Sequence, residues 1–311
     1  MKVVANGIRI EVEDSAPDGV HSGVHLPVVL LIMGLGMQLI AWPPGFVQGL
    51  VDAGFRVVRF DNRDSGLSDH QHHHGKPNLI WQGLKYKMGW SIKPPYSLDD
   101  LARDALGVLD SLKIDKAHIV GVSMGGMVAQ RVALLAPDRT RSLTSVMSSS
   151  GARGLPAATP RVSRQLLSRP AVKPGQDGKL AAIEHSVKLF QAIGSPGFPP
   201  DLDYLRERVK LSTQRSFNPN GLLRQMVAIA ADSSRAHQLK YITVPTLVVH
   251  GKADPLVPFA CGEDTARRIP GAHLVGIDGM GHDLPPGVVA LILAQLVPFL
   301  RCPFGYKHTA P

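Results

Sequence analysis

Cysteine and aromatic residues are both scarce in this 311-residue chain. The two cysteines, Cys261 and Cys302, fit neither a disulfide framework nor the spacing of a metal or redox motif, so we expect a reduced, cytoplasmic environment. Phe, Trp and Tyr supply 5% of the residues, too few for the stacking platforms that bind single-stranded nucleic acid. The formal net charge of +9 comes from scattered Lys and Arg, which indicates a basic solvated surface and not a nucleic-acid partner.

A long hydrophobic run is also missing. The longest apolar stretch, residues 26–40, is interrupted by Gly34 and Gly36 and is shorter than the roughly 20 residues that cross a bilayer as a helix. The first seven residues do not lead into an apolar run with a small-residue cleavage site. We therefore expect neither a membrane span nor a signal peptide.

Phosphate-binding motifs are absent, and the one histidine cluster is a poor metal site. The sequence contains no Gly-Lys-Ser/Thr phosphate loop, and Gly34-Leu35-Gly36 is followed by Leu39 where the dinucleotide fingerprint requires a third glycine. Consecutive histidines in a polar stretch cannot all face one ion; the cluster consists of His70, His72, His73 and His74. We expect no cofactor and no metal, and interpret the histidines as part of a solvated loop.

Short apolar runs recur along the chain and predict β-strands. Asn6 and Gly7 separate two short strand-like segments at 2–5 and 8–12, and this dipeptide favours a two-residue hairpin turn. The later runs are nearly continuous and rich in β-branched residues, which is typical of parallel strands buried on both faces. They span 28–33, 56–60, 118–122, 142–147, 246–250 and 273–277.

Helical periodicity separates most of these strands, over 45–53, 98–112, 125–136, 260–269 and 288–300. Such alternation predicts an α/β fold with a mostly parallel sheet of about eight strands and helices on both faces. Residues 70–96 are expected to form a long loop.

The alternation stops between 148 and 241, where three helix-like pieces follow one another at 180–191, 201–213 and 222–231. We expect a helical cap domain, residues 151–238, inserted after the sixth strand. Residues 1–150 and 239–311 would then form the core domain.

The motif Gly121-Val122-Ser123-Met124-Gly125 fits the pattern G-x-S-x-G, where an apolar strand meets an apolar helix. A serine hydroxyl is a weak nucleophile unless a sharp turn presents it to a base. Flanking glycines allow that turn because they have no Cβ. We predict that Ser123 is a nucleophile.

Two later segments supply an acid and a base in the chain order Ser, acid, His. Asp254 follows the strand at 246–250, and His282 follows the last strand. Because loops after parallel strands share one edge of the sheet, these side chains are expected to meet Ser123. His282 would take the Ser123 proton and Asp254 would orient His282. Asp278 and Asp283 lie too close to His282 along its own loop to serve as the acid.

Acyl transfer by these three residues also requires an oxyanion hole of backbone amides. One donor is expected at Met124, next to the nucleophile. The other is expected after the third strand, at Leu35, with Gly36 as a close alternative.

Further residues are expected to lie near Ser123, Asp254 and His282. Asp61 and Arg63 are expected to brace a neighbouring loop, and His250 is expected to be a satisfied structural residue. Candidate substrate contacts near the motifs and in the cap favour an uncharged, largely apolar small molecule; they are Gly34, Gly36, Met37, Trp42, Trp81, Phe190 and Phe217.

Together with the segment DNRDSGLS at 61–68, these motifs resemble the α/β-hydrolase superfamily over nearly the whole chain. The segment Ile32-Met33-Gly34, the pair Trp42-Pro43 and Asp64 are further similar to its aclacinomycin methylesterase-like branch. That resemblance implies hydrolysis of a carboxylic ester.

The favoured hypothesis is therefore ester hydrolysis through an acyl-enzyme on Ser123, with no cofactor. Lactone opening, carbon–carbon bond hydrolysis and N-terminal proline release use the same three residue types on this fold and stay open. A non-catalytic binding protein is the alternative of a different class. It would be expected to carry a degraded triad, whereas this sequence retains all three residues.

Overall fold

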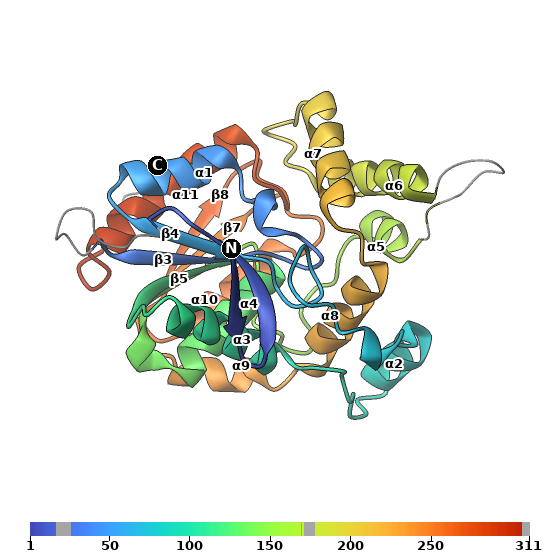
Figure 1. Cartoon of the computed structure of the whole chain (residues 1–311), viewed down its shortest axis with the longest axis horizontal. Coiled ribbons are helices and arrows are strands. Elements are labelled where there is room, and N and C mark those ends of the chain that lie inside the picture. The colour runs from blue at the N-terminus through green and yellow to red at the C-terminus, as the bar shows by residue number, and fades with distance from the viewer. Residues whose placement is uncertain (17–25, 169, 171–177, 307–311) are drawn as a thin grey trace.

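Residues 1–16, 26–168, 170 and 178–306 are described by the computed structural model. They contain one eight-stranded sheet in the spatial order β1-β2-β4-β3-β5-β6-β7-β8 (Figure 1). The strands are β1 (Lys2–Ala5), β2 (Ile8–Asp14), β3 (Val28–Ile32), β4 (Arg56–Phe60), β5 (Ala117–Val122), β6 (Thr140–Val146), β7 (Thr246–Gly251) and β8 (His273–Ile277).

In the described part of the chain, helices follow each strand from β3 onward, with two between β4 and β5 and a longer series between β6 and β7. They are α1 (Pro44–Asp52), α2 (Leu79–Lys87), α3 (Leu98–Ser111), α4 (Met124–Leu135), α5 (Pro160–Leu167), α6 (Gly178–Ile193), α7 (Leu202–Arg215), α8 (Pro219–Ala231), α9 (Arg235–Gln238), α10 (Phe259–Arg268) and α11 (Pro286–Arg301). Short 3-10 turns add η1 (Leu39–Ala41), η2 (His72–His74), η3 (Pro137–Arg139) and η4 (Leu239–Tyr241).

The strand pairing confirms the predicted sheet. Asn6 and Gly7 both have positive φ angles, of 48° and 80°, as the two-residue hairpin between β1 and β2 requires. The pairs β1/β2 and β2/β4 are antiparallel, whereas every later pair is parallel. The antiparallel part is therefore confined to one edge of a mostly parallel sheet.

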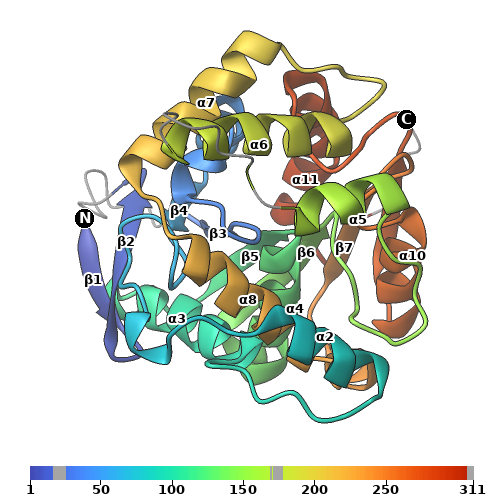
Figure 2. The ribbon, with the colours of Figure 1, turned by 90° about the vertical axis from the view of Figure 1, so that its right-hand side faces the viewer.

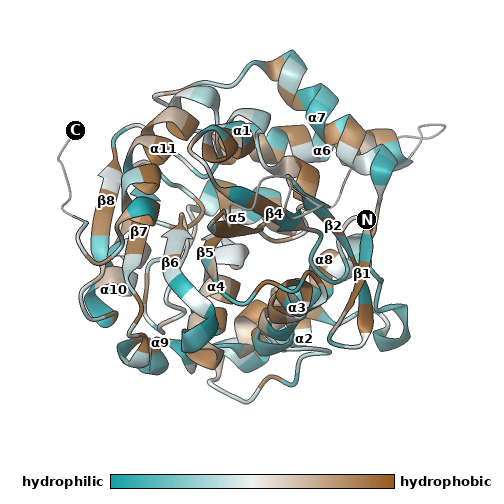
Figure 3. Cartoon of the chain, turned by 60° about the vertical axis from the view of Figure 1, so that its left-hand side comes forward, coloured by the Kyte–Doolittle hydropathy of each residue, from teal (hydrophilic) through white to brown (hydrophobic). Residues whose placement is uncertain are grey.

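Helices cover both faces of this sheet because its central strands are apolar on both faces. In β3, Leu30 and Ile32 pack with α3 and α4, whereas Val29 and Leu31 pack with α1 and α11. Burial of each such side chain contributes about 1.5–3 kcal/mol. Figure 3 shows apolar colour on α3 and β5, whereas β6 is largely pale and teal. Within the described residues, no helix is long and apolar enough to cross a membrane.

Five helices, α5 to α9, lie between β6 and β7 in the sequence. Figures 1 and 2 show α5, α6, α7 and α8 as a separate layer beyond one edge of the sheet. The predicted helices at 180–191, 201–213 and 222–231 correspond to α6, α7 and α8, whereas α5 was not expected. Its start is set locally, because the Thr159 side chain caps the Val162 amide and Pro160 occupies the first turn.

The prediction of a continuous loop over 70–96 was wrong, because this segment contains α2. The Asn78 side chain accepts a hydrogen bond from the Trp81 amide at 3.1 Å and caps the first turn. At the other end Gly89 has a φ of 69° and the Trp90 amide donates to the Lys85 carbonyl, which is the Schellman arrangement. The sequence contains both signals, since Asn78 is a favourable N-cap residue and Gly89 a favourable residue after the last helical turn.

Candidate active site

Ser123 lies in a sharp turn between β5 and α4. Its backbone has φ 54° and ψ −123°, a conformation that costs a non-glycine residue about 1–3 kcal/mol. A Cβ at Gly121 would lie 2.1 Å from the Gly125 carbonyl oxygen, and one at Gly125 would lie 2.0 Å from the Ile32 carbonyl oxygen. Only glycines fit these two positions, so the motif is a steric requirement of the turn.

The tertiary structure brings Ser123, His282 and Asp254 together. The Nε2 atom of His282 lies 2.9 Å from Oγ of Ser123, and its Nδ1 atom lies 2.7 Å from Oδ2 of Asp254. His282 is 8% exposed and Asp254 is 6% exposed. The three groups therefore form a hydrogen-bonded relay from the partly exposed Ser123 hydroxyl through a buried imidazole to a buried carboxylate.

The carboxylate of Asp254 is held on its second oxygen as well. Oδ1 accepts hydrogen bonds from the amides of Leu256 and Val257, at 2.9 and 2.8 Å. These bonds fix the plane of the carboxylate and leave Oδ2 directed at His282.

His250 lies behind Asp254 and is only partly satisfied. Its Nε2 atom lies 2.7 Å from the Val257 carbonyl oxygen, whereas its buried Nδ1 atom has no partner in the described part of the chain. Burial lowers the pKa of His250, which keeps the imidazole neutral. The expectation of a fully satisfied structural histidine was therefore wrong at one nitrogen.

The loop after β3 approaches Ser123 closely. A Cβ at Gly34 would lie 3.1 Å from Cβ of Ser123, so this glycine permits the close approach. The Gly36 amide donates to Oε1 of Gln225 at 2.8 Å, whereas the Leu35 amide has no acceptor within the described residues. The Met124 amide belongs to the first turn of α4, where no intrahelical acceptor exists. The amides of Leu35 and Met124 are therefore without an acceptor in the described part of the chain.

Ion pairs connect the loop after β4 to the helices that follow β6. Arg224 on α8 makes two hydrogen bonds to Asp64, of 2.7 and 2.8 Å, and the Tyr96 hydroxyl donates to the same carboxylate at 2.7 Å. Burial opposes ionisation of Asp64, but the hydrogen bonds from Arg224 and Tyr96 outweigh it and lower its pKa. Arg215 on α7 reaches Asp61 at 2.7 Å. The loop is therefore clamped by two cations from the inserted helices.

The expectation that Asp61 and Arg63 brace this loop agrees with their contacts. Asp61 accepts hydrogen bonds from the amides of Leu39 and Leu67, at 2.6 and 2.8 Å. Arg63 makes two 2.6 Å hydrogen bonds to Asp104 on α3. Both side chains are buried, and their partners are structural.

A second set of contacts fixes the loop that carries His282. The His282 amide donates to the Ile193 carbonyl at 2.7 Å, and the Gly281 amide donates to the Ser195 hydroxyl at 2.8 Å. Asp283 accepts hydrogen bonds from the hydroxyl and the amide of Ser195. The end of α6 and the residues after it therefore position the imidazole.

A family model described as "alpha/beta hydrolase fold" matches residues 27–285. The chain belongs to the α/β-hydrolase fold family. This hydrolase is 31% identical over 303 residues to the rhodomycin D methylesterase DauP of Streptomyces sp. (strain C5), covering 91% of this chain and 94% of that protein. It is also 31% identical to the rhodomycin D methylesterase DnrP of Streptomyces peucetius, over 88% of this chain and 90% of the relative.

Solved structures support the same fold. The enol-lactonase from Burkholderia xenovorans LB400 superposes with a TM-score of 0.67 at 22% identity, covering 97% of this chain and all of that one. A meta-cleavage product hydrolase from Pseudomonas fluorescens IP01 gives a TM-score of 0.68 at 20% identity, with 97% of each chain covered. The hydrolase therefore shares the architecture of these enzymes.

The predicted substrate contacts of the hydrolase lie in different environments. Trp42 is fully buried in the core, where its ring centroid lies 5.0 Å from that of Phe46. Trp81 lies on α2 and is 46% exposed, and Phe217 is 47% exposed. Met37 and Phe190 are partly buried.

Three residues beside the site were missed by the sequence prediction. Leu222 on α8 lies over Gly36, since a Cβ at Gly36 would meet its Cδ1 at 2.5 Å. Arg224 and Gln225 are buried on the same helix. A signal for them exists in the sequence, because this polar pair interrupts an apolar helical stretch.

The histidines at 70–74 lie in a segment that includes η2 and borders the Asp64–Arg224 pair. The Gln71 amide donates to Asp64 at 2.8 Å, and Arg224 donates to the Gly75 carbonyl at 2.6 Å. Burial lowers the pKa of His74, and its ring lies 4.1 Å from that of His73. In the part of the chain that the structure describes, no group of three or more His, Cys, Asp or Glu side chains is arranged to hold a metal ion.

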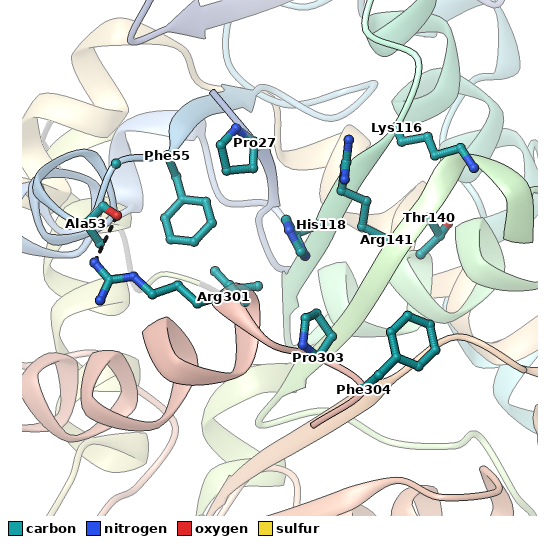
Figure 4. A pocket seen from close by; sticks show the side chains of 12 residues that line it. Pro27, Ala53, Phe55, Lys116, His118, Thr140, Arg141, Arg301, Pro303 and Phe304 are labelled. Atoms are coloured by element: carbon teal, nitrogen blue, oxygen red, sulfur yellow. Dashed lines mark hydrogen bonds between the residues drawn. The ribbon is translucent and has the colours of Figure 1, made fainter. Parts of the chain in front are cut away.

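A pocket of about 530 Å³ lies at the opposite edge of the sheet from Ser123 (Figure 4). It is lined by residues just before β3, β4 and β5 and at the start of β6, among them Pro27, Phe55, Lys116 and Thr140. Ligands of open α/β sheets bind outside the carboxyl ends of the strands, where Ser123, Asp254 and His282 follow β5, β7 and β8. This pocket therefore lies at the other end of the strands from Ser123, Asp254 and His282.

Proposed function

We propose that this hydrolase cleaves carboxylic esters of small molecules through an acyl-enzyme intermediate on Ser123. The observation that carries the proposal is the relay from Ser123 Oγ through His282 to Asp254, with hydrogen bonds of 2.9 and 2.7 Å. The names of the two methylesterase relatives support ester substrates.

In the first half of the reaction, Ser123 Oγ attacks the ester carbonyl carbon while Nε2 of His282 takes the hydroxyl proton. The imidazolium that forms is stabilised by Oδ2 of Asp254, which stays ionised. Because Leu256 and Val257 hold the other carboxylate oxygen, the acid needs no reorientation during the step.

The tetrahedral intermediate carries a negative charge on the former carbonyl oxygen. The free amides of Leu35 and Met124 are the proposed donors to it, and such donors contribute about 3–4 kcal/mol each. The Gly36 amide is not a donor in this scheme, because Gln225 already occupies it.

Collapse of the intermediate releases the alcohol with the proton from His282 and leaves the acyl group on Ser123. A water molecule then gives its proton to Nε2 of His282 and attacks the acyl carbon. The carboxylic acid leaves, and Ser123 regains its proton. The chain's own residues therefore supply the nucleophile, the base and the charge stabilisation.

We propose that residues 151–238 act as a cap that shapes the acyl and alcohol subsites. Leu222 lies over Gly36 on the loop that carries the Leu35 amide, and Met37 on the same loop and Phe190 on α6 are partly buried apolar side chains. These contacts favour an uncharged, largely apolar ester.

Three measurements test the function. Hydrolysis is followed for p-nitrophenyl esters of increasing acyl length and for methyl esters of bulky acids, with the parent and with Ser123→Ala. A fluorophosphonate should add one adduct, located at Ser123 by peptide mass analysis, and none in Ser123→Ala. The variant should lose nearly all turnover while keeping the thermal midpoint of the parent.

The matched control is Ser186→Ala, because Ser186 lies on α6 and its hydroxyl bonds to the Ala182 carbonyl within that helix. This variant should keep both turnover and labelling. Unchanged turnover in Ser123→Ala, or an adduct on another serine, would refute the mechanism.

A further inference from the structure

Helix α2 and its C-terminal flank expose an unusual number of large apolar side chains. Of the twenty such side chains exposed among the described residues, six lie within eleven consecutive positions. They are Ile80, Trp81, Leu84, Tyr86, Met88 and Trp90. Single exposed apolar residues are ordinary, whereas a contiguous group marks a surface that contacts another apolar phase.

Four of these positions form one stripe along the helix. Ile80, Leu84 and Met88 are spaced by four residues, and Trp81 adjoins them, so they share one side of the helix. We call these four residues the apolar stripe. Their exposed fractions run from 44% for Leu84 to 89% for Ile80, so the helix turns its apolar side to solvent.

The helix that presents the stripe is well anchored. Asn78 caps its first turn, and the Schellman arrangement at Gly89 closes its last turn. Its inner side contacts α8, and Figure 2 shows α2 on the outer side of that helix. The stripe is therefore held on a formed helix at the surface.

The charge around the stripe has one sign. Residues 70–98 contain four lysines and no Asp or Glu; the lysines are Lys76, Lys85, Lys87 and Lys93. Lys85 and Lys87 flank the stripe on the helix itself, and the Lys85 ammonium lies 5.7 Å from the Trp81 ring centroid. The chain as a whole carries a net charge of +9.

We propose that the apolar stripe of α2 docks this protein onto an anionic lipid surface. An interfacial helix combines an apolar face with lysines that reach the headgroups, and Trp and Tyr favour the interfacial region. A second copy of the chain is a poorer occupant, because it would bring four lysines against four lysines. The proposal concerns attachment to one leaflet and is independent of ester hydrolysis.

Sedimentation with vesicles tests it. Protein is mixed with vesicles of phosphatidylcholine alone or with about 30% phosphatidylglycerol, at about 0.05 M and about 0.5 M salt. We expect binding to the anionic vesicles at low salt and much weaker binding to the neutral ones or at high salt. Absence of binding to anionic vesicles at low salt would overturn the proposal.

Intrinsic fluorescence locates the contact. Trp81 and Trp90 are 46% and 49% exposed, whereas the third tryptophan, Trp42, is fully buried. Lipid contact through α2 should therefore shift the emission to shorter wavelength in step with sedimentation. Binding without any shift would place the contact elsewhere and contradict the proposal.

Paired variants separate the stripe from the general charge. Leu84→Gln with Met88→Gln should weaken vesicle binding at least about tenfold, whereas Leu202→Gln with Leu211→Gln, at two exposed leucines of α7, should not. Lys85→Gln and Lys87→Gln should each cost about fivefold. Equal vesicle binding by the α2 double variant and the α7 double variant would show that net charge alone attracts the protein and would refute the proposal.

Two further measurements complete the test. The α2 and α7 double variants are expected to have equal thermal midpoints, since the substituted side chains are exposed in both. Sedimentation velocity without lipid should show the same species for the parent and for the α2 variant. A dimer that the α2 variant abolishes would assign the stripe to a subunit interface and overturn the proposal.

Discussion

The side-chain carbonyl of Gln225 accepts a 2.8 Å hydrogen bond from the Gly36 amide. Gln225 is fully buried and also donates to the Arg63 carbonyl and the Ser65 hydroxyl. One residue of the inserted helices therefore orders the loop beside Ser123 and occupies one of its amides. The Leu35 amide, which has no acceptor in the described part of the chain, is therefore the donor proposed for this loop.

Substitutions at Leu35 should distinguish the contribution of its backbone amide to catalysis from that of its side chain. Leu35→Ala keeps the amide and should change kcat by less than about tenfold, whereas Leu35→Pro removes the amide hydrogen and should lower kcat by about 10²–10³. Both are measured in steady-state ester hydrolysis. Equal losses in the two variants would assign Leu35 a packing role.

The assignment of Asp254 as the acid can be tested against Asp278, an aspartate close to His282 in the sequence. Asp254→Asn should lower kcat by about 10³–10⁴, because the amide stabilises the wrong histidine tautomer. Asp278→Asn is the matched control and should stay within about tenfold, since Asp278 is exposed and, among the described residues, forms an ion pair only with Lys252. If Asp278→Asn lost activity and Asp254→Asn kept it, Asp254 would not be the acid.

The Arg224–Asp64 ion pair should be important for stability. Arg224→Met leaves a buried carboxylate without its cation and should lower the free energy of unfolding by about 3–5 kcal/mol, measured by urea denaturation. Arg206→Met removes an exposed ion pair with Glu184 and should change the free energy of unfolding by less than about 1 kcal/mol. Similar values for both variants would show that solvent screens the buried pair.

His118 should make stability depend on pH. Burial, helped by the charge of Arg141, lowers its pKa from 6.5 to about 4. Between these values the unfolded chain binds a proton that the folded chain does not, so stability is present above pH 6.5 and falls as the pH drops toward 4. The loss from this residue is at most about 3 kcal/mol.

Chemical denaturation at several pH values in this window checks the effect in the parent and in His118→Asn. The Asn side chain can keep a hydrogen bond to Ser142, which His118 makes through Nδ1 at 2.8 Å. The variant should lose less stability on acidification. An unchanged pH dependence would show that other groups are responsible.

The sequence alone determined the order of the strands and of most helices, although it missed α2 and α5. It also supplied the three residues of the proposed triad. Nearly continuous apolar runs predict strands of a parallel sheet whose two faces are covered by helices. The glycines at 121 and 125 are required by contacts below 2.2 Å with neighbouring backbone. Ser123, Asp254 and His282 follow three parallel strands, and that fact already places them at one edge.

Only the tertiary structure decided what surrounds these residues. The choice between the amides of Leu35 and Gly36 depends on Gln225, which lies 189 positions away in the chain. The burial of Trp42 depends on how α1 packs, because an indole suits a core and a binding surface equally well. Local signals specify elements and turns, whereas contacts between distant segments depend on the three-dimensional path of the chain, which no spacing along the sequence encodes.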